Sequence, residues 1–314
     1  MQKDLALLPT RPTPITTGHY GQSFPSTGSY AGQNATELAV IQYYLKDRLN
    51  TGDVTVEVYS ADGKLMASLP GTKRKGINYV RWDMRAAPPK AARGVLVQGE
   101  FGVYAGFIGQ TNLPGEYKVK IKAGNFSDEG SLTLIADPLQ PELDYAKKRS
   151  QSDELFSMVQ DLGLLEAQVR NLKDSLDQRN TLAKDKKAKA AITQLSGQLD
   201  SFRKTLTETI ESNGITGEQQ LRARIGKLYV LTEFTDEMPT KSIMDGAEPL
   251  RGELADAQKK ADQYFQKELA AVNALLKKEK LAPLRVIDRA EWLRQTEKTP
   301  PPPPGKPWMW GERH

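Results

Sequence analysis

The sequence predicts an α+β chain with several domains, in which an antiparallel β-sandwich precedes an antiparallel α-helical bundle. Across residues 36–137, apolar side chains recur at every second position, the period of a strand with one buried face. Across residues 138–290 they recur every three or four positions, the period of an amphipathic helix. Proline-rich segments at residues 1–35 and 291–314 flank these two regions. The 314 residues are enough for two ordinary hydrophobic cores.

Residues 1–35 are predicted to be a linker. Proline, glycine, serine and threonine dominate this segment and leave little from which to build a helix or a strand. Several rings interrupt this composition, namely His19, Tyr20, Phe24 and Tyr30. Two interpretations follow: the segment packs its aromatic side chains on a neighbouring surface, or it is a disordered tail.

The sandwich region opens with a predicted hairpin. Val54, Val56 and Val58 alternate with more polar residues, which is typical of a strand with one buried face. Asp62-Gly63 then supplies a turn, and residues 65–69 return as an apolar strand.

The next strand is predicted after a second turn, at residues 73–76. Its alternation places Val80, Trp82 and Met84 on one face, which we expect to be buried. Further strands are expected at residues 116–121 and 131–135.

An irregular, glycine-rich stretch interrupts the sandwich at residues 86–112. Neither of the two glycine motifs that cradle phosphates is present, and no helical pattern follows, so a phosphate-binding loop is disfavoured. We expect a long hairpin here, with residues 103–107 as a strand. Such an insertion at the end of a sheet is a common place for binding residues.

Short motifs follow one another in a fixed order through residues 30–140. Asp62-Gly63-Lys64 is followed by GINYVRWD at residues 76–83 and by LPGEYKVKI at residues 113–121. This order resembles the immunoglobulin-like (Ig-like) domain of flagellar hook-capping proteins. It is still more similar to the version near the carboxyl end of large, sortilin-like BNR-repeat proteins, which are often labelled glycosyl hydrolases. The resemblance extends with less specific motifs over most of residues 30–290.

The resemblance implies a role as well as a fold. In that family a β-propeller precedes the Ig-like domain, so the present chain would be a tail module that packs on a propeller, in cis or in trans. The family is exported, whereas residues 1–10 lack the features of a signal peptide. The expected location is therefore outside the cytoplasm if the native chain starts upstream, and cytoplasmic if Met1 is the native start.

Four amphipathic helices are expected beyond residue 140. The first runs from about residue 141 to 182, and the second has a strict 4-3 apolar alternation that resembles a coiled coil. The third follows a candidate capping box at Thr216 and Gln219 and ends before Met238-Pro239. The fourth is expected at residues 249–280. Short connections between these helices favour an antiparallel bundle.

A lysine-rich run, KDKKAK at residues 184–189, falls between the first two long helices. A positive tip at this point would suit phosphate groups or an acidic surface. The alternative, which the sequence alone favours, is a solvated helix connection.

The C-terminal segment returns to the composition of a linker. Residues 300–304 are consecutive prolines and therefore extended polyproline II, and Trp308 and Trp310 follow. The segment is either a ligand for an SH3-like domain or a stiff tail that folds back on its own or a partner's surface.

The inventory of reactive side chains argues against catalysis. The chain has two histidines, His19 and His314, and no cysteine, so an ordinary zinc site has no ligands and no metal or other cofactor is expected. No G-x-S-x-G elbow is present either. A glycosidase needs two carboxylates, and the candidates in the sandwich region are Asp83, Glu100, Asp128 and Glu129. Asp83 is better explained as a turn residue, and no partner marks Glu100, so we predict that the chain is not an enzyme.

Charge and hydropathy limit the classes of partner that the sequence predicts. The net charge of +5 arises from interspersed basic and acidic residues, which does not indicate nucleic-acid binding. No apolar run approaches the length of a membrane span.

Two functions remain after these exclusions. The first is a non-catalytic structural or interaction module with a protein partner. The alternative is an accessory carbohydrate-binding fragment of a glycosyl hydrolase whose activity would reside in a propeller outside this chain. Either function would use exposed aromatic side chains, and the candidates are Tyr43, Tyr44, Tyr79, Tyr104, Phe107, Trp308 and Trp310.

Overall fold

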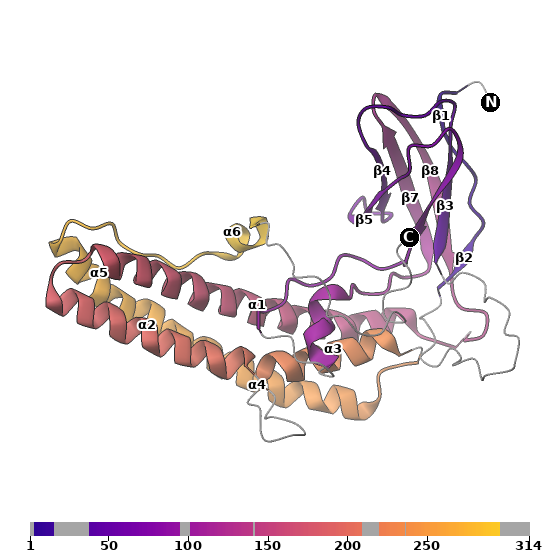
Figure 1. The fold of residues 1–314 in the computed structure, drawn as a ribbon. Helices are drawn as coiled ribbons and strands as arrows, with labels where there is room; N and C mark the ends of the chain where they lie inside the picture. Colours follow the sequence, from indigo (N-terminus) through magenta and orange to yellow (C-terminus); the bar gives the residue numbers. More distant parts are fainter. Residues whose placement is uncertain are drawn as a thin grey trace, which may run out of the picture. The chain divides into compact units, whose positions relative to one another are not determined.

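The computed structural model describes residues 3–15, 38–94, 101–140, 142–208, 220–235 and 237–295. It has the mixed α+β composition predicted from the sequence (Figure 1).

The chain forms two compact units that interleave along the sequence. The first, here called the sheet unit, comprises Met1–Pro88, Ile108–Ser152 and Thr232–Pro239. The second, called the helix unit, comprises Pro89–Phe107, Asp153–Leu231 and Thr240–His314. Each unit thus combines three separate stretches of the chain.

The sheet unit contains two sheets. The three-stranded sheet has the order β1 (Leu5–Leu7), β3 (Ala39–Leu45) and β6 (Gly76–Trp82). The five-stranded sheet has the order β2 (Thr13–Pro14), β8 (Phe126–Ile135), β7 (Gly115–Ala123), β4 (Val54–Tyr59) and β5 (Leu65–Pro70). Neighbouring strands are antiparallel except β2 and β8, so the second sheet is mixed and not purely antiparallel.

Both sheets contribute to one hydrophobic core. The inward positions alternate along each strand, as the period of two requires. Val80, Trp82 and Met84 are buried together in this core, which confirms the face predicted for them. The ring of Trp82 meets that of Tyr117 edge to face, with 5.7 Å between the centroids.

The predicted hairpin is confirmed. β4 and β5 pair antiparallel, and the chain reverses at Gly63, which has a φ of +83°. Glycine adopts this left-handed conformation without steric cost. The side chain of Ser60 donates to Asp62 at 2.5 Å and fixes the start of the turn.

Part of the predicted N-terminal linker is ordered as strands. β1 pairs with β3, and β2 pairs with β8. The carboxylate of Asp128 accepts the backbone N–H of Leu7 at 2.8 Å, and Leu5 and Ile15 are buried. Strands of two or three residues are too short to give a periodic signal in the sequence. They are stabilised by pairing with a neighbouring strand of the sheet, whereas their own composition contributes little.

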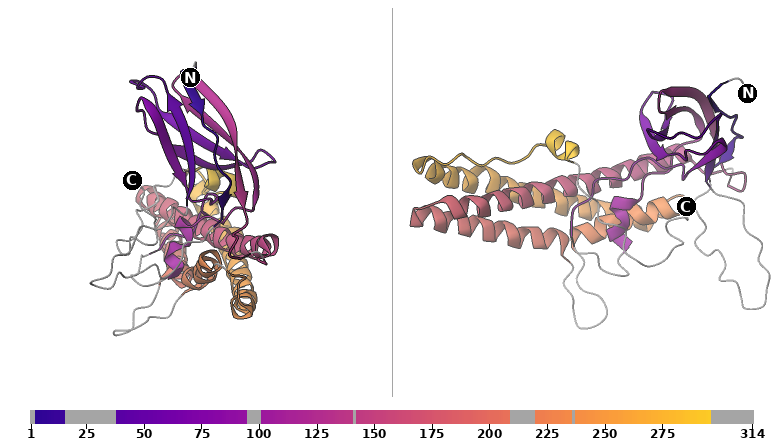
Figure 2. Two further views of the ribbon diagram at one scale, coloured as in Figure 1. Left: turned by 90° about the vertical axis from the view of Figure 1, so that its right-hand side faces the viewer. Right: turned by 45° about the horizontal axis from the view of Figure 1, so that its top comes forward.

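Helices account for most of the helix unit. The bounds are α1 Tyr145–Leu182, α2 Lys186–Thr207, α3 Leu221–Phe234, α4 Lys241–Gln263, a π-helical turn Tyr264–Glu268, α5 Leu269–Lys278 and α6 Arg289–Arg294. The first turns of α1 and the end of α3 belong to the sheet unit. α2 and α5 lie side by side within the helix unit (Figures 1 and 2). The apolar stripe predicted for the second helix is buried from Ala188 to Leu206.

The fourth helix begins earlier than predicted. We expected it at about residues 249–280, from its apolar stripe. In the structure α4 begins at Lys241, with Thr240 as the N-cap, and continues through Pro249. The Thr240 hydroxyl accepts the N–H of Ile243, so the cap and not the proline sets the start.

The strand expected at residues 103–107 is absent, and this prediction was wrong. Phe101–Phe107 forms a 3-10 helix in the helix unit. A Cβ atom at Gly102 would collide with the carbonyl oxygen of Ala223, and one at Gly226 would collide with Gly102. The two glycines therefore permit close contact between this segment and α3. This contact stabilises the 3-10 helix in place of the expected strand.

One buried carboxylate in the helix unit should make stability depend on pH. Glu166 of α1 is 1% exposed and accepts from Arg170 Nε at 3.0 Å and from the N–H of Arg93 at 3.3 Å. Burial raises the pKa of Glu166 above its usual 4.5, and Arg170 offsets only part of this effect. Because the folded state then binds the proton more tightly, stability should fall as pH rises from the usual value through the raised pKa.

Glu166→Gln is therefore expected to increase the free energy of unfolding at neutral pH and to weaken its decline with rising pH. Urea titrations over a pH series would measure both effects.

Asp128→Asn is the control, for which we expect a change in stability of the opposite sign. Burial tends to raise the pKa of Asp128, but hydrogen bonds from Leu7 and Lys3 lower it overall. Removing that carboxylate should thus reduce stability at neutral pH. A loss of stability at neutral pH in Glu166→Gln would contradict the argument.

Candidate functional site

The aromatic candidates lie in different environments. Tyr43 is fully buried in the core of the sheet unit, where its hydroxyl donates to the Thr72 carbonyl at 2.5 Å. Tyr104 of the helix unit is also buried, and Phe107 is half-buried. The rings of Tyr43 and Tyr104 are therefore not presented at the surface. Trp308 and Trp310 lie outside the described residues.

Tyr44 and Tyr79 share the outer face of the three-stranded sheet. Tyr44 pairs with Ile77, and Tyr79 pairs with Gln42, so the two rings are diagonal neighbours across β3 and β6. Ile77 is 69% exposed and Tyr79 is 52% exposed. The guanidinium of Arg81 lies 5.2 Å from the centroid of the Tyr79 ring. We call Tyr44, Ile77, Tyr79 and Arg81 the outer face.

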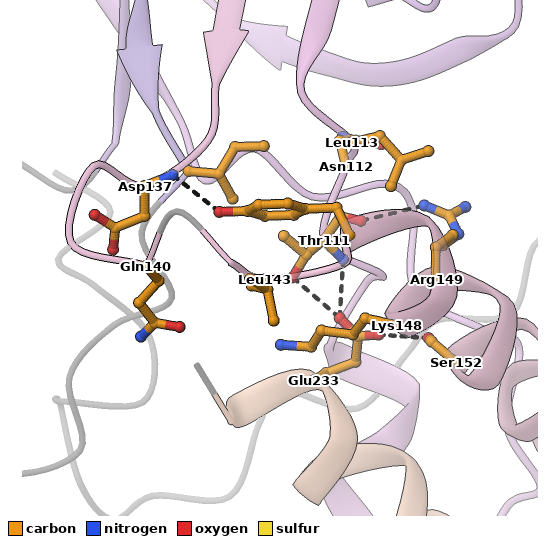
Figure 3. A pocket seen from close by; sticks show the side chains of 12 residues that line it. Thr111, Asn112, Leu113, Asp137, Gln140, Leu143, Lys148, Arg149, Ser152 and Glu233 are labelled. Atoms are coloured by element: carbon orange, nitrogen blue, oxygen red, sulfur yellow. Dashed lines mark hydrogen bonds between the residues drawn. The ribbon is translucent and has the colours of Figure 1, made fainter. Parts of the chain in front are cut away.

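A pocket in the sheet unit is lined by polar and charged side chains (Figure 3). They come from the end of the glycine-rich stretch, from the connection between β8 and α1, from the start of α1 and from the end of α3. The lining includes Thr111, Asn112, Asp137, Lys148, Arg149, Ser152 and Glu233. The cavity has room for only a few water molecules.

Glu233 is the centre of the hydrogen bonds in this pocket. Its carboxylate is 2% exposed and accepts from the Thr111 N–H at 2.8 Å, the Thr111 hydroxyl at 3.1 Å and the Ser152 hydroxyl at 2.5 Å. Arg85 Nη1 adds an ion pair at 2.9 Å. Four donors compensate the desolvation of this buried charge.

A strained turn aims Arg85 at Glu233. Met84 is buried and has a φ of +57°, a conformation that side chains other than glycine rarely adopt. The neighbouring backbone is held by hydrogen bonds between Met84 and Asn112 and between Ala86 and Gln110. The two terminal nitrogens of Arg85 then donate to the carbonyls of Gly109 and Glu233, at 2.8 and 2.9 Å, in addition to the Glu233 carboxylate.

Two cations complete the wall of the pocket, and both contact backbone carbonyls. Lys148 Nζ donates to the Thr235 carbonyl, and Arg149 Nη1 donates to that of Thr111 at 3.2 Å. The side-chain amide nitrogen of Asn112 is buried without a protein partner among the described residues. A water in the cavity would satisfy this donor.

The hydrogen bonds of Glu233 connect the end of α3 with Arg85, Thr111 and α1. The hydroxyl of Ser152 donates to Glu233 and accepts from Gln110 at 2.9 Å, and Ser152 is 1% exposed. A nucleophile must be accessible to its substrate, and a general base must direct a free lone pair at the proton that it abstracts. Ser152 and Glu233 meet neither requirement in this geometry.

The other carboxylates that we considered have structural roles or lie outside the described residues. The Asp83 side chain accepts the N–H of Arg85 at 3.2 Å, which confirms it as a turn residue. Asp128 and Glu129 both have pKa values below their ordinary range, Glu129 because Lys118 donates to it. A general acid for glycoside hydrolysis needs a raised pKa, which neither has. Glu100 lies outside the described residues.

Within the described part of the chain, no group of histidine and acidic side chains has the arrangement of a metal site, and no helix is both long and apolar enough to cross a membrane. No family model matches the sequence, and comparisons with curated proteins and with solved structures likewise gave no match.

Sequence reasoning did not find the network around Glu233. Its members are far apart in the sequence, with Arg85 and Glu233 separated by 148 positions. Each residue alone resembles an ordinary surface charge or hydroxyl. The one available signal was Glu233 itself, which follows the apolar stripe of α3 in a position that the fold buries.

Proposed function

We propose that the chain is a non-catalytic interaction module, in which an Ig-like β-sandwich and a helical bundle pack on or space a protein partner. The partner is a β-propeller, in cis or in trans, of an exported, sortilin-like BNR-repeat protein. The motif order in residues 30–140 supports the identity of the partner. The saturated hydrogen bonds of Glu233 and Ser152 support a structural role. In this proposal the chain needs no cofactor.

The outer face carries the proposal. Ile77 and Tyr79 are large, exposed and on the same side of β6, which is at the edge of its sheet. Protein interfaces are enriched in tyrosine and arginine at their centres, and this face has both in Tyr79 and Arg81. An edge strand also offers backbone groups to which a partner strand can pair. The outer face thus combines a side-chain anchor with a backbone template.

We predict that the double variant Ile77→Lys and Tyr79→Ala weakens binding to a purified propeller partner by roughly thirtyfold, equivalent to about 2 kcal/mol. The partner would be identified with a photoreactive residue at position 79, and affinity would be measured by titration calorimetry. Leu65→Lys is the matched control, because Leu65 is 48% exposed on β5 of the other sheet. Its affinity should equal that of the unmodified chain.

An equal loss in Leu65→Lys, or crosslinks from position 79 to proteins without a propeller, would refute the proposal.

The outer face also supports the alternative, an accessory carbohydrate-binding fragment. Sugars stack on neighbouring aromatic rings, and Tyr44 and Tyr79 are diagonal neighbours. Retardation in gels containing polysaccharide, abolished by Tyr79→Ala, would favour that alternative. Any glycoside hydrolase activity would then reside in a propeller outside this chain.

A further inference from the structure

Two lysine runs meet at one end of the helix unit. The loop between α1 and α2 contributes Lys184, and the first turns of α2 contribute Lys186, Lys187 and Lys189. The end of α5 contributes Lys277 and Lys278, and Lys280 follows it. The carboxylate of Glu279 joins the two runs, since it accepts the backbone N–H of Lys184 at 2.6 Å and that of Asp185 at 3.1 Å. Figures 1 and 2 show the α1–α2 loop beside the end of α5. We call these lysines the lysine tip.

The charge of the lysine tip is not neutralised within the described residues. All seven lysines are exposed, and none forms an ion pair with a described side chain. The tip contains two carboxylates, Asp185 and Glu279, and the seven lysines outnumber them. Asp185 caps α2 by accepting the N–H of Ala188 at 2.9 Å, and Glu279 holds the α1–α2 loop. Other lysines of the helix unit, such as Lys173 and Lys204, have acidic partners one turn away.

The lysines at the start of α2 oppose the helix dipole. The positive end of the dipole lies at the N-terminus, where acidic residues stabilise a helix and basic residues destabilise it. α2 nevertheless begins with Lys186 and Lys187 and has no acidic residue in its first turn. Lys277 and Lys278 stabilise the end of α5, so helix stability explains them, but it does not explain the lysines of α2.

The backbone at Lys280 gives a second indication. Lys280 has a φ of +61° just after α5, where glycine is the usual residue. The Leu281 N–H closes this turn on the Leu276 carbonyl at 3.0 Å. Lys280 thus adopts a conformation that is unfavourable for lysine, close in sequence to two other lysines. Stability alone would favour glycine at position 280.

We propose that the lysine tip binds the surface of an anionic lipid bilayer through headgroup phosphates. Lysine ammonium groups are mobile point charges, which suit a layer of phosphates better than one planar ligand. Leu182, the last residue of α1, is 54% exposed and supplies an apolar side chain for the interface. Residues 176–189 and 272–284 contain no aromatic side chain, so the tip lacks the stacking platforms of single-strand nucleic-acid binders.

The test uses the full chain and sedimentation with vesicles of phosphatidylcholine, with or without phosphatidylglycerol, at low and high salt. We expect binding only to the anionic vesicles, weakened by salt. The double variant Lys186→Glu and Lys187→Glu should reduce it by roughly tenfold or more, since two attractions become repulsions. The same changes improve the charge of the first turn of α2, so the urea midpoint should not fall. A loss of binding therefore cannot be due to unfolding.

The matched control is Lys227→Glu with Lys241→Glu, which makes the same change in net charge on α3 and α4 of the helix unit. Its binding should equal that of the unmodified chain. Three results would overturn the proposal: equal binding to neutral vesicles, equal losses in both double variants, or tighter binding to a DNA or RNA oligonucleotide than to anionic vesicles. Because the outer face lies in the other unit, this test is independent of binding to a propeller.

Discussion

Glu233→Ala is expected to lower the free energy of unfolding of the sheet unit by about 3–5 kcal/mol. The substitution removes the ion-pair partner of Arg85, whose side chain is only 16% exposed, and leaves a poorly solvated cation. It also leaves the Thr111 N–H and the Ser152 hydroxyl without their acceptor. A buried donor that loses its partner costs far more than the hydrogen bond itself contributes. Urea denaturation followed by tryptophan fluorescence would measure the change.

The controls separate burial from ion pairing as such. Arg224 and Glu253 form a two-point ion pair on the exposed surface of the helix unit, so Glu253→Gln should cost about 1 kcal/mol or less. The double variant Arg85→Met with Glu233→Leu removes both buried charges and should be less destabilised than Glu233→Ala. A Glu233→Ala variant as stable as Glu253→Gln would show that the network does not hold the sheet unit together.

The network also illustrates what could not be predicted from the sequence. Ion pairs between distant residues depend on the tertiary path of the chain, and Arg85, which pairs with Glu233, directly follows Met84 in its left-handed conformation. No local pattern encodes that turn. By contrast, the alternation through Val80 and Trp82 and the apolar stripe of α2 were predicted correctly, because burial of one face imposes a period on the sequence.

The wrong predictions share a physical cause, which is that tertiary contacts override local preference. Residues 103–107 were expected to be a strand but belong to the 3-10 helix Phe101–Phe107, in which Gly102 permits close contact with α3. β1 is stabilised by pairing with β3, and its three residues are too few to predict that pairing from the sequence. Only part of the lysine tip could be predicted from the sequence, namely the run at residues 184–189. The second run, at the end of α5, is brought beside it by the fold.

Trp82→Ala should also be severely destabilising, by about 3–5 kcal/mol. The side chain is fully buried between the two sheets, packs edge to face on Tyr117 and donates its indole N–H to the Arg85 carbonyl at 3.0 Å. Alanine would leave a large cavity and an unsatisfied carbonyl at the turn that positions Arg85. Trp82→Phe retains most of the volume and should cost less. The free energy of unfolding from urea titrations, followed by circular dichroism, would rank the two variants.

Tyr79→Ala is the control on the same strand. Tyr79 points to the opposite face of β6 and is half exposed, so its removal should change stability by about 0.5 kcal/mol or less. A slip of one residue in the pairing of β6 with β3 would exchange the two faces. A costly Tyr79→Ala combined with a mild Trp82→Ala would therefore refute the register. With the expected ranking, Tyr79 contributes little to the fold, and the presence of a large ring at this exposed position is better explained by binding.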